Sequence, residues 1–160
     1  MEQYKAAVIT VSDGCSTGQR VDTSGPAVCE MLRDAGYEVI YTVVISDERE
    51  AIASALCQCA DGLRCDLVIT TGGTGLSPRD VTPEATRDVL EREIPAIPQA
   101  MLFESLKITP RAMLSRAAAG TRGSTLIVNL PGSEKAAREN LRAVLGTLSH
   151  GLKMLHGGGH

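Results

Sequence analysis

The stretch Asp66-Leu-Val-Ile-Thr-Thr71, followed directly by Gly72-Gly-Thr-Gly75, is the strongest architectural signal in this chain. Its first six residues are mostly apolar or β-branched and predict a buried strand, which the small residues after them end. Three glycines allow the backbone to approach a ligand closely and to point several N–H groups into one concavity, which suits a phosphate. Many glycine turns only redirect the chain, so the turn by itself leaves both interpretations open.

Three further segments predict strands around this one: Ala6–Val11, Glu38–Ile45 and Thr125–Leu130. Apolar residues at helical spacing lie between the strands and after Ser133, a predicted N-cap. These stripes are Val28, Met31, Leu32 and Ala35; Ile52, Ala55, Leu56, Cys59, Ala60 and Leu63; and Ala137, Leu141, Val144, Leu145 and Leu148. Strands that alternate with helices predict an α/β fold: a three-layer α-β-α domain over residues 1–160 with a mostly parallel central sheet.

The second half of the chain predicts three more elements. Thr82-Pro83-Glu84 is typical of a helix start, with Thr82 as the cap and Pro83 at the first helical position. Residues Ala100–Leu106 predict a short helix. Residues Ala117–Arg122 predict an extra strand that pairs near Thr125–Leu130 across a turn at residues 123–124.

Composition restricts the class of protein and its partners. Hydrophobic residues make up 43% of the 160 residues and charged residues 22%, which is typical of one soluble domain. A net charge of −3 without a basic run argues against nucleic-acid binding, and no apolar stretch is long enough to span a membrane. The N-terminal residues predict a strand rather than a signal peptide, so we expect a cytoplasmic protein.

The five cysteines predict reduced thiols, because their number is odd and no secretory signal accompanies them. Cys57, Cys59 and Cys65 also suggest a metal site. Cys57 and Cys59 are two residues apart on a predicted helix and would face different directions, so we favour buried thiols.

Polar or glycine-rich residues follow each of the four main predicted strands. These segments are Ser12-Asp13-Gly14, Ser46-Asp47-Glu48, Gly72–Gly75 and Pro131-Gly132-Ser133. If the strands are parallel, all four segments lie at the carboxyl edge of the sheet, where open α/β sheets bind ligands. Gly, Asp and Ser are also common turn residues, so connection alone accounts for part of the pattern.

Three acidic residues at this edge point to a metal-assisted reaction of phosphates. Asp13 and Asp47 follow strands, and Asp80 lies in the loop after the glycine turn. Each of them alone has the simpler interpretation of a helix cap or turn residue. Together, beside a phosphate-suited turn, they are hard oxygen ligands that would hold Mg²⁺ against phosphate oxygens. Arg79 and Arg116 are candidate phosphate clamps or, equally, solvated surface residues.

Two common nucleotide fingerprints are missing, since the chain has neither a P-loop nor Gly-x-Gly-x-x-Gly after its first strand. Instead, an ordered set of motifs closely resembles the molybdopterin adenylyltransferase family, the MogA and MoaB type related to the gephyrin G domain. The motifs are Val11-Ser-Asp-Gly14, Asp22-Thr-Ser-Gly25, Thr71-Gly-Gly-Thr-Gly75, Arg79-Asp-Val-Thr-Pro-Glu84, Leu114-Ser-Arg116 and Asn129-Leu-Pro-Gly132. They match in order and approximate spacing over nearly the whole chain.

The resemblance implies that ATP and molybdopterin react, with Mg²⁺, to adenylyl-molybdopterin and pyrophosphate. It implies that Asp47 and Asp80 are catalytic and hold the metal. Residues implied to contact the nucleotide, phosphates and pterin are Ser12, Asp13, Gly72, Gly73, Thr74, Gly75, Ser115, Asn129, Pro131 and Gly132. It also implies a homotrimer, with a hexamer as the variant, and other molybdenum cofactor biosynthesis proteins as partners.

One alternative within the resemblance is a non-catalytic MoaB-type oligomer that binds or scaffolds the pterin without turnover. Inactive members of that group tend to lose the acid at the position of Asp47 and the Arg-Asp-Val pattern, both of which are present here. The sequence therefore favours the enzyme. A different phosphate-bearing pterin or nucleotide substrate is the third interpretation.

Overall fold

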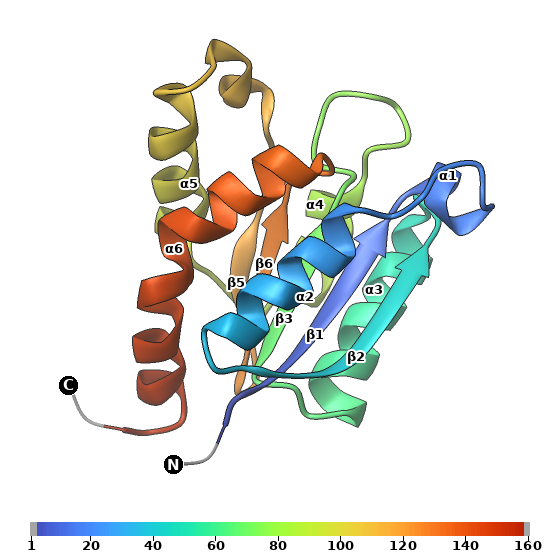
Figure 1. The fold of residues 1–160 in the computed structure, drawn as a ribbon. Helices are drawn as coiled ribbons and strands as arrows, with labels where there is room; N and C mark the ends of the chain where they lie inside the picture. Colours follow the sequence, from blue (N-terminus) through green and yellow to red (C-terminus); the bar gives the residue numbers. More distant parts are fainter. Residues whose placement is uncertain (1–2, 159–160) are drawn as a thin grey trace.

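A computed structural model describes residues 3–158, in which six strands form one sheet in the order β2-β1-β3-β6-β5-β4 (Figure 1). The strands are β1 (Lys5–Val11), β2 (Glu38–Ile45), β3 (Leu67–Thr71), β4 (Arg92–Glu93), β5 (Ala119–Arg122) and β6 (Thr125–Leu130). The α-helices are α1 (Asp13–Ser16), α2 (Ser24–Asp34), α3 (Arg49–Cys57), α4 (Thr82–Val89), α5 (Ala96–Leu106) and α6 (Glu134–Leu155). A π-helical turn, η1 (Gln58–Gly62), extends α3, and a 3₁₀ turn, η2 (Pro110–Leu114), follows α5.

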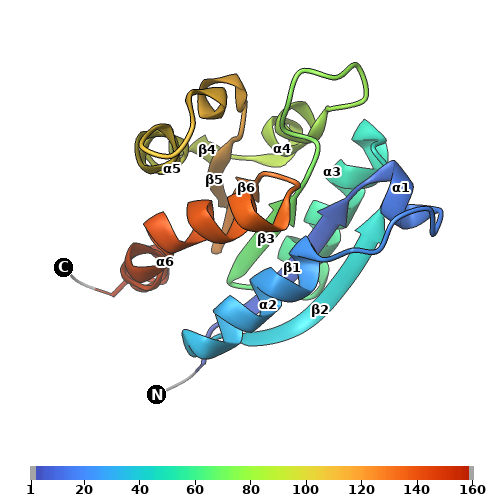
Figure 2. The ribbon, with the colours of Figure 1, turned by 45° about the horizontal axis from the view of Figure 1, so that its top comes forward.

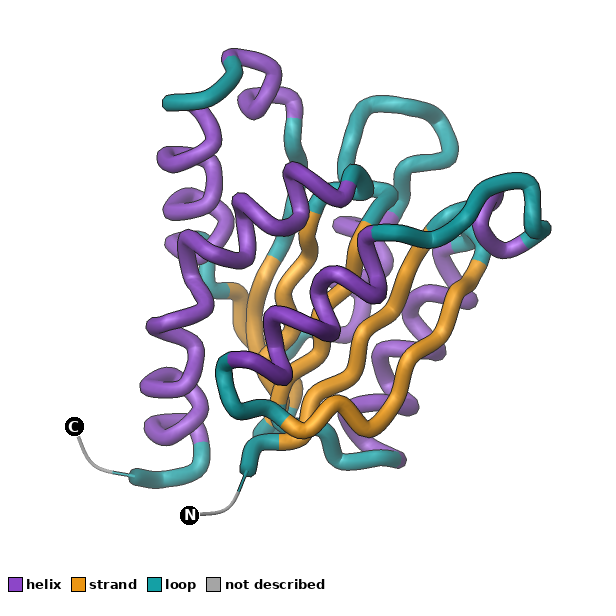
Figure 3. The backbone as a smooth tube through the Cα atoms, viewed as in Figure 1, coloured by secondary structure: helices purple, strands orange, loops and turns teal. Residues whose placement is uncertain are grey.

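Helices cover both faces of the sheet, which gives the predicted three layers (Figure 2). Helices α2 and α6 lie on one face, while α3 and α4 lie on the other (Figure 3). Side chains of β1 alternate between the two cores: Val8 packs on the side of α2 and α6, and Ile9 on the side of α3 and α4. The α/β prediction with a mostly parallel sheet is confirmed, because β2, β1, β3 and β6 pair in parallel.

Most element predictions agree with the structure. The predicted hairpin forms from β5 and β6 and turns at Gly123, whose φ of +55° favours glycine. The N-cap prediction for Ser133 is also confirmed, since its hydroxyl accepts a hydrogen bond from the Ala136 N–H. Helix α5 is longer than predicted and includes Pro98 near its start, where the first helical N–H groups need no intrahelical acceptor. The exposed two-residue strand β4 was not predicted, because it carries no apolar signal.

One cap prediction is wrong. Helix α4 begins at Thr82 itself, with Val81 in the cap position, and no side chain caps it. The Thr82 N–H donates to the carbonyl oxygen of Gly73 at 3.1 Å, which joins the helix start to the glycine turn. The Thr82 hydroxyl is buried without a hydrogen-bond partner.

The strand order places a binding crevice at the carboxyl ends of β1 and β3. From β1 the chain moves outward to β2 and then returns to the other side of β1 as β3. At such a reversal the connections leave in opposite directions and open a crevice. Within residues 3–158, no helix has the length and apolar character needed to cross a membrane.

Candidate active site

Two cavities open at the carboxyl edge, and the turn Gly72–Gly75 lies between them. The larger one, about 610 Å³, is lined by Gly72 and Gly73 and by polar side chains; we call it the polar cavity. The second, about 370 Å³, is lined by Thr74 and Gly75 and mainly by apolar side chains; we call it the apolar cavity. One short turn therefore contributes to two chemically different spaces.

The glycines of the turn are required by its geometry. Gly72 and Gly73 have φ values of +93° and +70°, which other residues rarely adopt. A Cβ on Gly72 would collide with the carbonyl oxygen of Val11 at the end of β1, and one on Gly73 with the Thr82 hydroxyl. The Gly72 N–H donates to the carbonyl oxygen of Leu130 at 3.0 Å, which fixes the turn between β1 and β6.

Asp47 and Asp80 both lie close to this turn. A Cβ on Gly73 would lie 3.2 Å from Asp47 Oδ1, and one on Gly75 would lie 3.0 Å from Asp80 Oδ2. Both aspartates line the polar cavity. Burial raises the pKa of the Asp47 carboxyl, and the negative charges of Asp13 and Asp80 act in the same direction.

The polar cavity carries more negative than positive charge. Its lining includes four carboxylates and one guanidinium, those of Asp22, Asp47, Asp80, Glu134 and Arg20. Ser12 and Gly132 also line it. A polyphosphate alone would be repelled by this arrangement, whereas a polyphosphate that carries a divalent cation would complement it.

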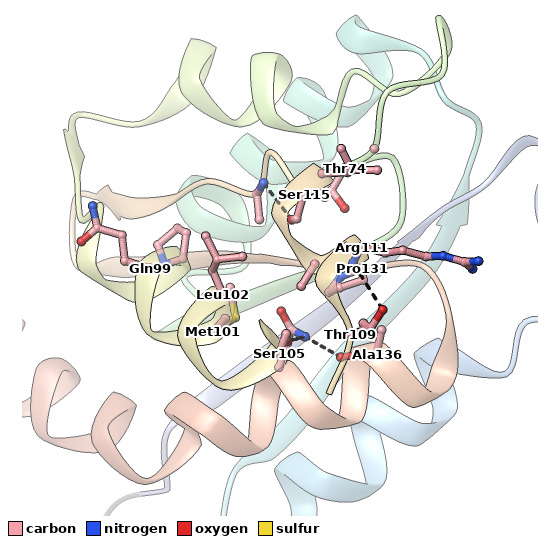
Figure 4. Close-up of a pocket in the computed structure, with 16 residues that line it drawn as sticks. Thr74, Gln99, Met101, Leu102, Ser105, Thr109, Arg111, Ser115, Pro131 and Ala136 are labelled. Carbon is pink, nitrogen blue, oxygen red and sulfur yellow. Dashed lines mark hydrogen bonds between the residues drawn. The ribbon is translucent and has the colours of Figure 1, made fainter. Parts of the chain in front are cut away.

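The apolar cavity lies between α5, η2 and the start of α6 (Figure 4). Met101, Leu102 and Ser105 line it from α5, and Thr74 and Ser115 lie across from them in the view. Pro131 also lines it. Apolar walls with a few hydroxyl and amide groups suit a flat heterocycle that needs both stacking surface and hydrogen bonds.

Two of the residues implied to contact the nucleotide, phosphates or pterin lie outside both cavity linings. Asn129 is fully buried beneath the turn: its amide donates to the hydroxyls of Thr70 and Thr86, both at 3.0 Å, and accepts from the Ala118 N–H. Its side chain supports the site from behind. Asp13 is engaged by Arg79 in two hydrogen bonds of 3.0 Å, and this pairing lowers the pKa of the Asp13 carboxyl.

The two candidate phosphate clamps bind other parts of this chain. Arg79 pairs with Asp13 and, at 2.9 Å, with Glu48. Arg116 donates to the carbonyl oxygens of Gly75 and Asp80 and to the Glu84 carboxylate. Both guanidinium groups therefore fasten the loop of residues 75–80 to the protein.

Sequence reasoning missed part of the polar cavity. Asp22 accepts hydrogen bonds from the Thr10 hydroxyl and the Gly25 N–H, at 2.7 and 3.0 Å, and Ser24 donates to the Thr71 hydroxyl at 3.1 Å. In the sequence, the motif Asp22-Thr-Ser-Gly25 contributes only to the family resemblance and does not by itself indicate a cavity. Its place at the start of α2 is the usable signal, because α2 returns antiparallel to β1 and so begins at the carboxyl edge.

Known proteins resemble this chain over nearly its whole length. The family model described as "Probable molybdopterin binding domain" matches residues 7–150. Molybdopterin adenylyltransferase from Helicobacter pylori (strain ATCC 700392 / 26695) is 40% identical over 159 residues, which cover 98% of this chain and 90% of that protein. Molybdenum cofactor synthesis protein cinnamon from Drosophila melanogaster is 41% identical over 157 residues, 97% of this chain but only 26% of that longer protein.

Among solved structures, the molybdopterin biosynthesis enzyme MoaB from Thermus thermophilus superposes with a TM-score of 0.92 at 46% identity. The superposition covers 97% of this chain and 98% of that one. The resemblance inferred from the motifs is confirmed. The chain belongs to the molybdopterin-binding domain family of molybdenum cofactor biosynthesis, which includes the molybdopterin adenylyltransferases.

Proposed function

We propose that this protein is a Mg²⁺-dependent molybdopterin adenylyltransferase that joins ATP to the terminal phosphate of molybdopterin. The observation that carries the proposal is that Asp47 and Asp80 both lie against the Gly72–Gly75 turn and line the polar cavity, while the same turn also lines the apolar cavity. The named activity of the bacterial relative that this chain covers almost completely agrees with it.

The two cavities suit the two substrates. The triphosphate of ATP would occupy the polar cavity, and the pterin ring would lie among the apolar walls near Ser115 and Pro131. An oxygen of the pterin's phosphate would then form a bond to the α-phosphorus while the bond from that phosphorus to the β-phosphate oxygen breaks. Pyrophosphate leaves with the electron pair of the broken bond.

The donor set fits Mg²⁺. Among the described residues, no group of three or more His, Cys, Asp or Glu side chains is arranged to hold a metal. Mg²⁺ is usually bound through one or two carboxylates together with substrate phosphates, so Asp47 and Asp80 form a sufficient protein contribution. When bound, the ion would neutralise charge on the phosphates during transfer. The protein itself would orient the two substrates and exclude water from the reacting phosphates.

The family resemblance and composition supply the remaining parts of the proposal. We propose a homotrimer, with a hexamer as the variant assembly, located in the cytoplasm and formed from one domain per chain. The non-catalytic alternative, a pterin-binding oligomer, uses the same cavities without transfer.

A turnover assay with ATP, Mg²⁺ and freshly prepared molybdopterin, analysed by mass spectrometry, tests the proposal. Asp47→Asn and Asp80→Asn should each lower turnover by about 100-fold or more, because each removes a charge that positions the metal and phosphates. Asp88→Asn is the control, since Asp88 forms an exposed ion pair with Arg49. Wild-type binding of the pterin without product would favour the non-catalytic alternative, and undiminished turnover in both variants would refute the assigned residues.

A further inference from the structure

Arg116 fastens both ends of the loop that carries Asp80. Its Nε donates to the carbonyl oxygen of Gly75 at 2.8 Å, and its Nη2 donates to that of Asp80 at 2.7 Å. The backbone N–H of Arg116 adds a third link, to the carbonyl oxygen of Thr74 at 2.9 Å. One residue therefore connects the glycine turn with the far end of the loop.

Other contacts also hold the loop: Arg79 pairs with Asp13 and Glu48, and the Thr82 N–H donates to the Gly73 carbonyl oxygen just after the loop. Its residues 76–79 are exposed, and it rises from the sheet in Figure 1. The Asp80 carboxylate accepts the Ser77 N–H at 3.0 Å, and the Asp80 N–H donates back to the Ser77 carbonyl oxygen at 2.9 Å. These bonds shape the loop internally but do not attach it to the sheet. The two carbonyl bonds of Arg116, which we call its fork, bind the backbone at both ends of the loop, and one of them joins the Asp80 backbone to a different segment of the chain.

The charge of Arg116 is already balanced within this chain. Its Nη1 donates to Glu84 Oε2 at 2.6 Å, and both side chains are about one-third exposed. The two carbonyl bonds need donors at fixed relative angles, which a planar guanidinium offers and a lysine ammonium does not. This geometry distinguishes loop positioning from a role in which only positive charge matters.

We propose that Arg116 is a positioning residue for the transfer reaction: its two carbonyl bonds hold the loop so that the Asp80 carboxylate lies against Gly75. This inference rests on the proposed function. In this role Arg116 does not contact the substrates. The geometry of its two carbonyl bonds should affect turnover more than its ion pair with Glu84 does.

Three variants separate these contributions. Arg116→Lys keeps the charge and loses the fork. Glu84→Gln removes the ion pair and leaves both carbonyl bonds. Arg122→Lys is the matched control, because Arg122 also donates to a backbone carbonyl, that of Val89, and to a carboxylate, that of Asp61. Arg122 lies at the end of β5, at the opposite edge of the sheet.

Two readouts are needed: steady-state kinetics and hydrogen–deuterium exchange of peptides that cover residues 76–81. A displacement of about 1 Å can cost about 100-fold in rate. We therefore expect Arg116→Lys to lower kcat at least tenfold with KM for the pterin nearly unchanged, and to speed exchange in this loop at least tenfold. Glu84→Gln and Arg122→Lys should stay within threefold of the wild type in both.

The inference is overturned if Arg116→Lys keeps wild-type kcat and loop exchange, or if Glu84→Gln impairs both as strongly. Exchange in the loop does not depend on turnover, so the two proposals can fail separately. An inactive wild-type protein would refute the proposed function, while faster loop exchange in Arg116→Lys alone would still support the positioning role.

Discussion

Asp13 and Asp47 bind each other's backbone. The Asp13 N–H donates to Asp47 Oδ2 at 2.8 Å, and the Asp47 N–H donates to Asp13 Oδ1 at 3.0 Å. This reciprocal pair joins the ends of β1 and β2 and orients the Asp47 carboxylate, whose Oδ1 lies on the side of Gly73. Two carboxylates thus lie close together without binding each other, because each accepts an amide from the other residue.

Asp13→Ala should lower the free energy of unfolding. It should reduce turnover, but by a smaller factor than Asp47→Asn does. The variant removes the acceptor of the Asp47 N–H and the partner of Arg79, but the Asp13 N–H still orients Asp47. The lost hydrogen bond should lower the free energy of unfolding. Urea unfolding measures the stability, and Asp88→Ala controls for the loss of an exposed carboxylate. A turnover loss equal to that of Asp47→Asn would contradict the assigned difference in roles.

Gly72→Ala should lower the free energy of unfolding by about 2 kcal/mol or more. Backbone strain at a positive φ typically costs about 1–3 kcal/mol, and the new Cβ also meets the carbonyl oxygen of Val11. Gly151→Ala is the matched control: it lies within α6 with no atom near an added Cβ, so it should raise stability by about 0.5–1 kcal/mol. Equal effects of both changes in thermal unfolding would refute the close approach at Gly72.

Glu84→Gln should show a stability difference that depends on pH. Arg116 lowers the pKa of the Glu84 carboxyl below its ordinary value of 4.5. The folded state therefore favours the ionised form, and its contribution is present above pH 4.5 and is lost as pH falls through the lowered pKa. Because the pair is partly exposed, we expect less than about 1 kcal/mol. Denaturant unfolding of the wild type and the variant between pH 7 and pH 3 should show the difference in unfolding free energy shrinking on acidification. A difference that grows on acidification would contradict the lowered pKa of Glu84.

Arg79→Gln should loosen the loop of residues 75–80 without unfolding the protein. Arg79 connects the loop to Asp13 and Glu48, and all three side chains are substantially exposed. Salt screens such pairs, so loop exchange in the wild type should rise between 0.05 and 0.5 M salt, whereas the variant should respond less. The free energy of unfolding should stay close to that of the wild type, because exposed ion pairs contribute little to stability. Loop exchange that is insensitive to both salt and the substitution would exclude this role.

The sequence predicted the sheet and the glycine turn well because their signals are local. Residues 66–75 contain the buried strand and the turn in one continuous run, and parallel order follows from the alternation of strands and helices. The exposed strand β4 and the true start of α4 had no such signal. At Thr82 the backbone bond to Gly73 decides the helix start, which is a contact that local propensity does not encode.

The interior of the site was harder to predict because it depends on which partner each polar side chain finds. Arg116 is of a residue type that often binds phosphate, but its donors face two carbonyl oxygens in the loop. The side chain of Asn129 also binds within the protein, because its amide donates to hydroxyl groups in a buried network under the turn. The apolar wall that α5 contributes to the apolar cavity gave no signal, because Met101 and Leu102 are indistinguishable from core residues in the sequence.

The most direct test of nucleotidyl transfer is the fate of labelled phosphorus. The wild-type protein is incubated with molybdopterin, Mg²⁺ and ATP that carries ³²P at either the α- or the γ-position. The proposed reaction predicts label in the pterin product from α-labelled ATP only, with the γ-label released as pyrophosphate. Transfer of the γ-label to the pterin, or no transfer of either label while the pterin stays bound, would contradict the proposed adenylyltransferase.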